Sequence, residues 1–349
     1  MAIYYKILTD DMIHHGFQYK IGENVLKEKF NPKGNCKPGG FYICDLEDIC
    51  CWLNLHNNMA TIYEVILFKE SQLIKQDNKY KTDKLILQNP LPIAEFLEKH
   101  NICKKAVQQN GFNIVHIKNP SEEIKMAAVK ENGRVINSIE NPSEEIKMAA
   151  VKQNAYVING IENPSKAIQM AAVRKDGHAI QFIEIPSEEV QMAAVREDGH
   201  AIQFIEIPSE ELQMIAVQNN GYAIQYIENP PEEVQMAAVK QNGFVVKFLE
   251  NPSKEVQMAA IKKYEGSIKF IKNPSEEVKM IAVQQHGNVI QYIENPSKEV
   301  KLAAVQNIGW AIMHIENPSK DVQIAAVYQD QRMLEYLKNT LKEDQLAAF

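Results

Sequence analysis

The chain of 349 residues has few cysteines, no long apolar run and no excess of positive charge. No apolar stretch approaches the roughly 18 residues of a membrane span, and the N-terminus lacks the basic-then-apolar pattern of a secretory signal. Acidic residues outnumber basic ones, 45 to 38, and the net charge is −7. This balance argues against a protein built to neutralise nucleic-acid phosphates. We therefore expect an intracellular protein with no membrane contact and with nucleic acid as a disfavoured partner.

Motifs of catalysis, cofactor binding and metal binding are also missing. Cys36, Cys44, Cys50 and Cys51 fall in the first 51 residues, but the C-x2-C spacing of a zinc site does not occur. The glycines of KPGGFY (37–42) match neither a phosphate-binding loop nor a dinucleotide-binding fingerprint. No catalytic triad has a recognisable local context. We therefore predict no catalytic residue, no cofactor and no metal, and we interpret the cysteines as free thiols.

A 22-residue pattern repeats along most of the chain. Its consensus is close to N-P-S-E-E-V-Q-M-A-A-V-K-Q-N-G-Y-A-I-Q-F-I-E, and ten complete copies occupy residues 119–338. A degenerate copy precedes them, and KEDQLAAF (342–349) matches the first half of a copy. Atypical terminal copies are usual in stacked repeat arrays. Proline marks the start of every complete copy, at positions 120, 142, 164, 186, 208, 230, 252, 274, 296 and 318.

Each repeat predicts two short helices. Asn-Pro-Ser-Glu-Glu is a helix start, with Asn as the N-cap, Pro at the first helical position and the acids at the positive end of the helix dipole. Where Asn is replaced, at Ile185 and Ile207, Ser187 and Ser209 remain as caps. A glycine in seven of the ten repeats is expected to end the first helix in a left-handed conformation. The next Asn-Pro ends a second helix of about two turns.

Helices this short are marginal alone, so the repeat predicts an α-solenoid held together by contacts between neighbouring copies. The predicted core consists of apolar columns that recur every 22 residues, and methionines fill uneven gaps beside them. The columns begin at Ile124, Ala128, Val129, Ile136 and Ile139, and the methionine column begins at Met126. The predicted fold class is mainly α: an α-solenoid of short helix pairs with a small N-terminal α+β head.

The head lacks the repeat and mixes strand and helix patterns. We expect strands at Tyr4–Leu8, Ile62–Phe68 and near Lys84–Leu87, and a helix from about Leu46 to Leu55. The predicted domains are the head at residues 1–90, a linker and degenerate capping repeat at 91–118, ten helical repeats at 119–338 and a truncated half-repeat at 339–349.

Two stretches resemble known sequences. The unit P-S-E-E-V-Q-M-A-A-V-K-Q-N-G-Y-A-I-Q-Y-I resembles a helical-repeat family of unknown function that is abundant in giant DNA viruses of the mimivirus type. GFQYKIGENVL (16–26) and FNPKGNCKPGGFYICDLEDI (30–49) are similar to the N-terminal domain of giant-virus ankyrin-repeat proteins. The resemblance implies a viral origin and a helical superhelix, and it carries over no catalytic residue. The array itself differs from ankyrin repeats, whose period is about 33 residues.

One column, just after the glycine, varies far more than the others. A second column four residues on, which includes Phe182, Phe204 and Tyr226, is expected on the same helical face. The two columns together predict an aromatic stripe that could bind a partner. The alternative is that the second column packs between successive helices and the first is tolerated surface. The candidate partner-binding residues are Tyr156, His178, His200, Tyr222, Phe244, Trp310 and Arg332.

The sequence favours a non-enzymatic protein–protein interaction scaffold of a giant DNA virus, with an unidentified host or viral protein as its partner. We expect it in the host cytoplasm, with packaging in the virion as the second possibility. A structural or virion-associated role is the alternative function, and an enzyme in the head, tested at Cys36 or Cys44, is a third. A basic column that includes Lys130, Lys152 and Arg174 is the feature that nucleic-acid binding would need, but acidic columns flank it.

Overall fold

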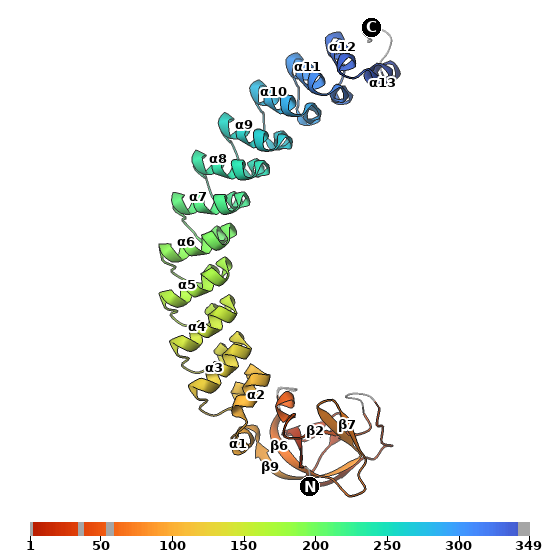
Figure 1. Cartoon of the computed structure of the whole chain (residues 1–349), viewed down its shortest axis with the longest axis vertical. Helices are drawn as coiled ribbons and strands as arrows, with labels where there is room; N and C mark the ends of the chain where they lie inside the picture. The colour runs from red at the N-terminus through yellow and green to blue at the C-terminus, as the bar shows by residue number, and fades with distance from the viewer. Residues whose placement is uncertain (1–2, 34–37, 54–58, 341–349) are drawn as a thin grey trace. The chain divides into compact units, whose positions relative to one another are not determined.

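The structure, a computed structural model, describes residues 3–33, 38–53 and 59–340. It divides into two compact units, Met1–Lys175 and Asp176–Phe349. The first unit contains a strand-rich head followed by helical repeats, and the part of the second unit that is described contains helices alone (Figure 1). The repeat pattern and the mixed N-terminal head thus follow the predicted fold class.

Nine strands are described in the head, in three antiparallel sheets. One sheet has the order β1-β6-β9-β4, a second has the order β5-β8-β7, and β2 and β3 form a hairpin. Backbone hydrogen bonds between Tyr5 and Cys44 join β1 to the segment after β5. Leu8, Phe41 and Leu87 belong to the core between them. The strands are β1 (Tyr4–Thr9), β2 (Ile13–His14), β3 (Phe17–Gln18), β4 (Gly22–Val25), β5 (Phe41–Ile43), β6 (Met59–Ile66), β7 (Leu73–Gln76), β8 (Lys79–Thr82) and β9 (Lys84–Pro92).

The head departs from its sequence prediction in two respects. The expected strands are present as β1, β6 and β9, but the helix expected over Leu46–Leu55 is replaced, in its described part, by one 3-10 turn, η1 (Ile49–Trp52). Its Ile, Cys and Trp side chains have lower helix propensity than the straight-chain residues that sustain longer helices. Six other strands, of two to four residues each, were missed because such short segments show no clear alternation.

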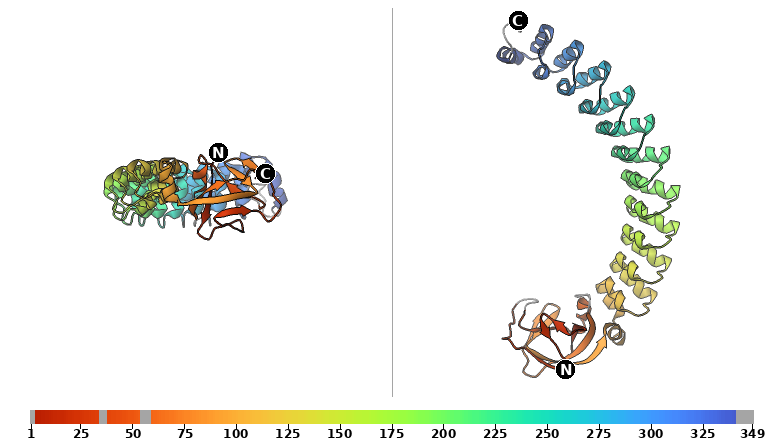
Figure 2. Two further views of the ribbon diagram at one scale, coloured as in Figure 1. Left: turned by 90° about the horizontal axis from the view of Figure 1, so that it is seen from below. Right: turned by 180° about the vertical axis from the view of Figure 1, so that it is seen from behind.

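Each complete repeat except the last consists of a ten-residue α-helix and a 3-10 helix of six residues. Two short helices per repeat were predicted. Figures 1 and 2 show the α-helices of each unit in one row and the 3-10 helices in a second row beside it. The first unit contains α1 (Ile93–Lys99), α2 (Cys103–Gln109), η2 (Gly111–His116), α3 (Glu122–Glu131), η3 (Gly133–Ser138), α4 (Glu144–Gln153), η4 (Ala155–Gly160) and α5 (Lys166–Lys175). 

The second unit continues the same alternation and ends differently. Its last described element is an α-helix of nine residues, which replaces the 3-10 helix of the other repeats. The elements are η5 (Gly177–Phe182), α6 (Glu188–Glu197), η6 (Gly199–Phe204), α7 (Glu210–Asn219), η7 (Gly221–Tyr226), α8 (Glu232–Gln241), η8 (Gly243–Phe248), α9 (Lys254–Lys263), η9 (Glu265–Phe270), α10 (Glu276–Gln285), η10 (Gly287–Tyr292), α11 (Lys298–Asn307), η11 (Gly309–His314), α12 (Lys320–Gln329) and α13 (Arg332–Thr340).

In most repeats the N-cap of the α-helix is serine, so the predicted asparagine cap is wrong, and in α8 the N-cap is Pro231. The Ser121 hydroxyl oxygen accepts a hydrogen bond from the Ile124 N–H at 3.4 Å, and the same bond recurs in most repeats. The asparagine two residues earlier has a left-handed backbone, with φ of 45° at Asn119, which asparagine adopts more readily than most residues. Asn-Pro therefore makes the turn before the helix, and the serine starts it.

The glycines that recur every 22 residues were predicted to end the α-helix in a left-handed conformation, and this prediction is wrong. Each begins the 3-10 helix, and in the described part of the chain positive φ is confined among glycines to Gly16, Gly22 and Gly39. Space explains the choice of residue instead: a Cβ on Gly177 would lie 2.5 Å from the Ala194 carbonyl oxygen of the next repeat. Close backbone approach is a second reason for glycine besides turn geometry.

Hydrogen bonds from one side chain join successive repeats at this close approach. The Asn219 Oδ1 accepts the Gly199 N–H at 3.0 Å, while its Nδ2 donates to the Arg196 carbonyl at 2.9 Å. Asn307 does the same for Gly287 and Gln284, at 2.8 Å each. The bonds satisfy the last carbonyls of one helix and the first N–H of the next, groups that helix ends leave without intrahelical partners.

The predicted core columns are buried. In most repeats the columns that begin at Ile124, Ala128, Val129, Ile136 and Ile139 are at most 9% exposed. The exceptions are Ile124, Leu249, Val327 and Leu334, which are only half-buried. The methionine column is only half-buried, in keeping with a gap-filling role. Within each unit the repeats thus have an apolar core between two outer rows of helices, and the 3-10 row holds the variable column.

Candidate functional site

Four predicted partner-binding residues, His178, His200, Tyr222 and Phe244, follow one another along the 3-10 row of the second unit. Each is the second residue of its 3-10 helix, and its backbone N–H donates to the Asp or Asn side chain two residues earlier, at 2.9–3.0 Å. This turn fixes the direction in which each ring leaves the backbone. All four side chains are half-buried.

Each of these rings packs against an aromatic side chain of the next repeat. The ring centroids lie 5.6 Å apart for His178 and Phe204, 5.8 Å for His200 and Tyr226, and 6.1 Å for Tyr222 and Phe248, all edge to face. Phe244 lies 5.5 Å from Phe270. Separations of this size and geometry are favourable for aromatic pairs. We call these eight residues the aromatic stripe.

The stripe joins the two columns differently from the prediction. Their spacing of four residues predicts one shared face of an α-helix, but the segment is a 3-10 helix, which has three residues per turn. Residues four apart in it point in different directions, so the two columns of one repeat do not pair. The contacts instead run from the first column of one repeat to the second column of the next. The rings therefore pack between successive repeats and also reach solvent, with Tyr226 40% exposed. Partner binding by these columns stays a prediction.

Tyr264 extends the stripe where the first column is interrupted, and it was not among the predicted residues. It stands at the Asn or Asp position of its repeat and stacks on Phe244, with centroids 4.5 Å apart and an interplanar angle of 18°. The next column position is Gly266, where a Cβ would lie 2.6 Å from the Tyr264 ring. The sequence does contain a signal for this exchange: tyrosine stands at position 264, where most other repeats have Asn or Asp, and glycine stands at position 266, where most have a larger side chain.

Two lysines lie over the rings and were also missed. The Lys247 Nζ is 4.6 Å from the Phe248 centroid, and the Lys269 Nζ is 4.7 Å from the Phe270 centroid and 5.8 Å from that of Tyr292. In four other repeats the same position is glutamine, and its amide donates to a backbone carbonyl three residues earlier. The stripe therefore carries positive charge in the repeats around Phe248 and Phe270, held by cation–π contacts.

An aspartate links the two histidines of the stripe. Asp198 places Oδ2 3.3 Å from the His178 Nδ1 and Oδ1 3.3 Å from the His200 Nδ1. The Asp176 carboxylate is 3.7 Å from the His178 Nδ1. The histidine end of the stripe is thus held by carboxylates, whereas the phenylalanine end carries lysines.

The other three predicted residues lie outside the stripe. Trp310 and Arg332 pair with each other: the guanidinium carbon lies 5.2 Å from the ring centroid, and the Trp310 Nε1 donates to Asp330 at 2.9 Å. Bonds from Arg332 lower the pKa of the Asp330 carboxyl to about 2. Tyr156 belongs to the first unit and is 43% exposed.

Cys44 and Cys50 of the head are poorly placed to act as nucleophiles. Cys44 and Cys50 are buried, and burial raises the pKa of both thiols, for Cys50 to about 11. Thiols with raised pKa values are poor nucleophiles at neutral pH, because the thiolate is the reactive form. Cys36 lies outside the described residues. In the described ranges, no group of three or more His, Cys, Asp or Glu side chains is arranged to hold a metal ion.

Comparisons with known proteins match parts of the chain. Residues 2–99 match a family model described as a domain of unknown function (DUF7666). An uncharacterized protein of Acanthamoeba polyphaga mimivirus is 40% identical over 65 residues, which cover 18% of this chain and 47% of the relative. A putative ankyrin repeat protein of the same virus is 32% identical over 89 residues, which cover 24% of this chain and 44% of the relative.

A second putative ankyrin repeat protein of that virus is 37% identical over 59 residues, 17% of this chain and 18% of the relative. The chain spans less than half the length of these curated relatives. No solved structure matches it. The homologues are therefore mimivirus proteins, either uncharacterized or named for ankyrin repeats, as the resemblance had implied. In the described part of the chain no helix is both long and apolar enough to cross a membrane.

Proposed function

We propose that the protein is a non-enzymatic scaffold that binds a protein partner, host or viral, through the aromatic stripe. The observation that carries this proposal is the run of interlocked rings over consecutive repeats, which are packed yet keep part of their surface in solvent. Aromatic residues dominate the energetics of protein interfaces. The similarity to proteins named for ankyrin repeats supports the scaffold role.

The stripe fits an extended segment with apolar and acidic side chains. Rings already held by their neighbours lose little conformational entropy on binding, and Tyr222, Phe248 and Phe270 offer edges to apolar groups. Lys247 and Lys269 lie over the same rings and would pair with carboxylates of the segment. We place this interaction inside the infected host cell, with the virion as the alternative location.

Nucleic acid suits this surface less well. The basic column, which includes Arg174, Arg196 and Lys240, lies in the last turns of the α-helices, whereas the rings lie on the 3-10 helices. Binding to a single strand combines a basic groove with stacking rings at one place. The net charge of −7 also opposes phosphate binding. Catalysis by Cys44 is disfavoured by the raised pKa of its thiol.

The test compares the full chain with two variants in affinity purification from infected and uninfected host lysate. The stripe variant combines Tyr222→Ala, Phe244→Ala and Phe248→Ala. The control is Tyr328→Ala, which removes a tyrosine that is 92% exposed on α12, away from the stripe. A partner retained by the wild type and the control but lost from the stripe variant supports the proposal, provided that circular dichroism shows equal helix content.

A second pair of variants tests the charge of the stripe. Lys247→Gln combined with Lys269→Gln restores the glutamine found in neighbouring repeats, so the fold has a precedent for it. The control is Lys240→Gln combined with Lys262→Gln on the α-helices. Weaker, more salt-tolerant binding by the first pair alone is the expected result. A partner held equally by the wild type and the stripe variant would show that the binding surface lies elsewhere.

A further inference from the structure

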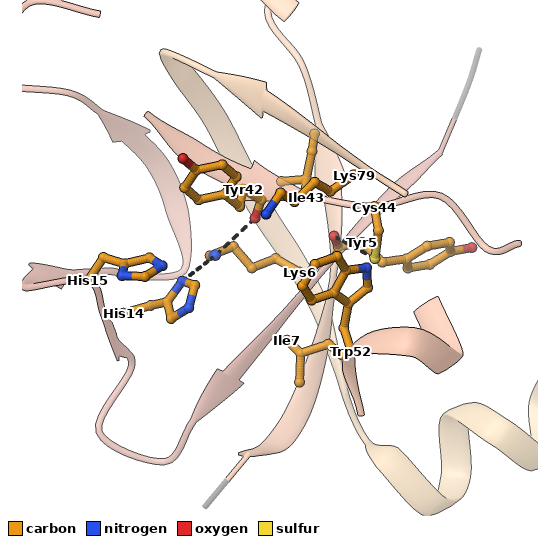
Figure 3. A pocket seen from close by; sticks show the side chains of 10 residues that line it. All are labelled: Tyr5, Lys6, Ile7, His14, His15, Tyr42, Ile43, Cys44, Trp52 and Lys79. Carbon is orange, nitrogen blue, oxygen red and sulfur yellow. Dashed lines mark hydrogen bonds between the residues drawn. The ribbon is translucent and has the colours of Figure 1, made fainter. Parts of the chain in front are cut away.

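The head contains a pocket that the proposed scaffold function does not use (Figure 3). Its volume is about 50 Å³, and its lining includes Lys6 of β1, His14 and His15 at the hairpin, Tyr42 of β5, Trp52 of η1 and Lys79 of β8. Basic and aromatic side chains therefore meet in one small hollow. The Lys6 side chain reaches toward His14 and the backbone of Tyr42.

Lys6 is buried, and its amine contacts no negatively charged group in the described part of the chain. Its side chain is on the core side of β1, and the residue is 2% exposed. Its Nζ lies 3.1 Å from the His14 Nδ1 and 3.0 Å from the Tyr42 carbonyl oxygen, and 4.7 Å from the centroid of the Tyr19 ring. Within the described residues it makes no ion pair with a carboxylate. An isolated buried ammonium is costly, and such a lysine loses its proton instead.

The hydrogen bonds fit a neutral amine. A neutral amine has two N–H groups, and the two acceptors at Lys6 can take both of them when the His14 Nδ1 is unprotonated. The nitrogen lone pair is then left for a ligand in the pocket. Burial lowers the pKa of Lys6 to about 7, a shift only partly opposed by Cys44. The titratable groups that face its amine are His14 on β2, Tyr19 after β3 and Cys44 after β5.

We propose that this pocket is a covalent binding site for small carbonyl compounds that carry a carboxylate, with the Lys6 amine as the nucleophile. The Nζ lone pair forms a bond to the carbonyl carbon, and the π electrons of the C=O bond move to oxygen, which takes a proton from the nitrogen. The resulting carbinolamine loses its hydroxyl with the second amine hydrogen as water. The product is an imine, and no oxidant or reductant is consumed. Buried lysines of this kind are known as nucleophiles toward carbonyl groups.

The other lining residues indicate which carbonyl compound fits. The Lys79 Nζ is held 4.8 Å from the Tyr42 centroid and 4.9 Å from the Trp52 centroid, and it lines the same pocket as Lys6. A cation fixed by two rings beside the nucleophile favours a carboxylate near the carbonyl group. The small volume restricts the ligand to a few heavy atoms, so an aldehyde acid or a short 2-oxo acid is the expected class.

Reductive trapping on the full chain tests the site. The protein is incubated at pH 7 with glyoxylate or, as an uncharged reference of two carbons, acetaldehyde, and cyanoborohydride reduces any imine to a stable amine. Peptide mass spectrometry then gives the modification rate of each lysine. We expect Lys6 to react with glyoxylate at least about tenfold faster than the exposed Lys27, because burial lowers the pKa of Lys6 and leaves a large share of its amine neutral at this pH. Glyoxylate should also label Lys6 faster than acetaldehyde does.

Variants separate the pocket from general reactivity. Lys6→Met should abolish the fast-labelled site, Lys27→Met should leave the rate at Lys6 unchanged, and Lys79→Gln should lower the rate with glyoxylate more than with acetaldehyde. In urea the preference for Lys6 should disappear. Labelling of Lys6 by glyoxylate no faster than that of Lys27 in the folded protein would overturn the proposal. Equal rates with glyoxylate and acetaldehyde would overturn the carboxylate requirement.

Discussion

Replacing Lys6 by methionine should change the pH dependence of head stability in a defined direction. Burial holds the pKa of Lys6 at about 7 in the folded head, against 10.5 for an exposed lysine. Between these two pH values the unfolded state binds the proton and the folded state does not, so folding becomes more favourable as pH rises. Below pH 7 the wild type carries the whole penalty of charging the buried amine. Methionine has no proton to bind, so this dependence is absent from the variant.

The size of the effect follows from the same two values. Each pKa unit corresponds to 1.36 kcal/mol, so the free-energy difference between the variant and the wild type should change by about 4 kcal/mol from pH 6 to pH 10.5. At high pH Lys6→Met is expected to destabilise the head by about 1–3 kcal/mol, because the His14 Nδ1 and the Tyr42 carbonyl lose their donor. At pH 6 the variant should therefore be the more stable protein.

Urea unfolding followed by Trp52 fluorescence measures this difference. Trp52 lies in the head beside the pocket, and Trp310, the other tryptophan of the chain, is removed by Trp310→Phe in both proteins. Contributions from other titrating groups cancel in the comparison with the wild type. Lys27→Met, at an exposed position, serves as the control. A difference between Lys6→Met and the wild type that stays constant from pH 6 to pH 10.5 would refute the reasoning.

Three further predictions concern the repeats. Gly199→Ala should destabilise the array by about 1–3 kcal/mol, because its Cβ would lie 2.5 Å from the Ala216 carbonyl oxygen. Ala155→Gly in the same column is the control, and equal urea midpoints for Gly199→Ala and the wild type would contradict the steric argument. Ser209→Ala should cost about 1 kcal/mol by removing the cap bond to the Leu212 N–H, and more than Ser187→Ala, where no such bond forms. Arg332→Ala should increase acrylamide quenching of Trp310, whose ring it covers, whereas Lys338→Ala should not.

The repeated pattern allowed the helices and the core of the array to be predicted from the sequence. The contacts between side chains of successive repeats could not be predicted in this way. The 22-residue period and the buried columns follow from patterns that ten copies reinforce. Six residues are too few to distinguish a period of 3.0 from one of 3.6, so the 3-10 geometry was missed and with it the pairing of His178 with Phe204. Tyr264 was missed because it enters the stripe from a different column.

The pocket of the head could not be predicted from the sequence for a different reason. Lys6 lies in YYKILT, where alternation assigns a polar residue to the solvent face of a strand. Both faces of β1 are covered, because residues 5–8 are all buried. Only the arrangement of the β2–β3 hairpin and β5 around this strand brings His14 and the Tyr42 carbonyl to the amine. That arrangement depends on pairings that the sequence pattern does not encode locally.

The aromatic stripe gains its regularity from contacts that reach one repeat ahead. Residues 176–189 and 198–211 are identical, and this copying places Asp198 between His178 and His200 because the aspartate of one repeat meets the histidine of the preceding one. In the next repeat the position is Asn220, whose Nδ2 lies 3.3 Å from the His200 Nδ1. A copied repeat therefore contains both the histidine and the aspartate of this contact. A residue in the first column also has to pack against the aromatic ring of the next repeat. A partner would contact the exposed edges of these rings, while their buried edges pack against neighbouring repeats. Lys247→Gln combined with Lys269→Gln therefore tests binding with less disturbance of packing than the removal of a ring.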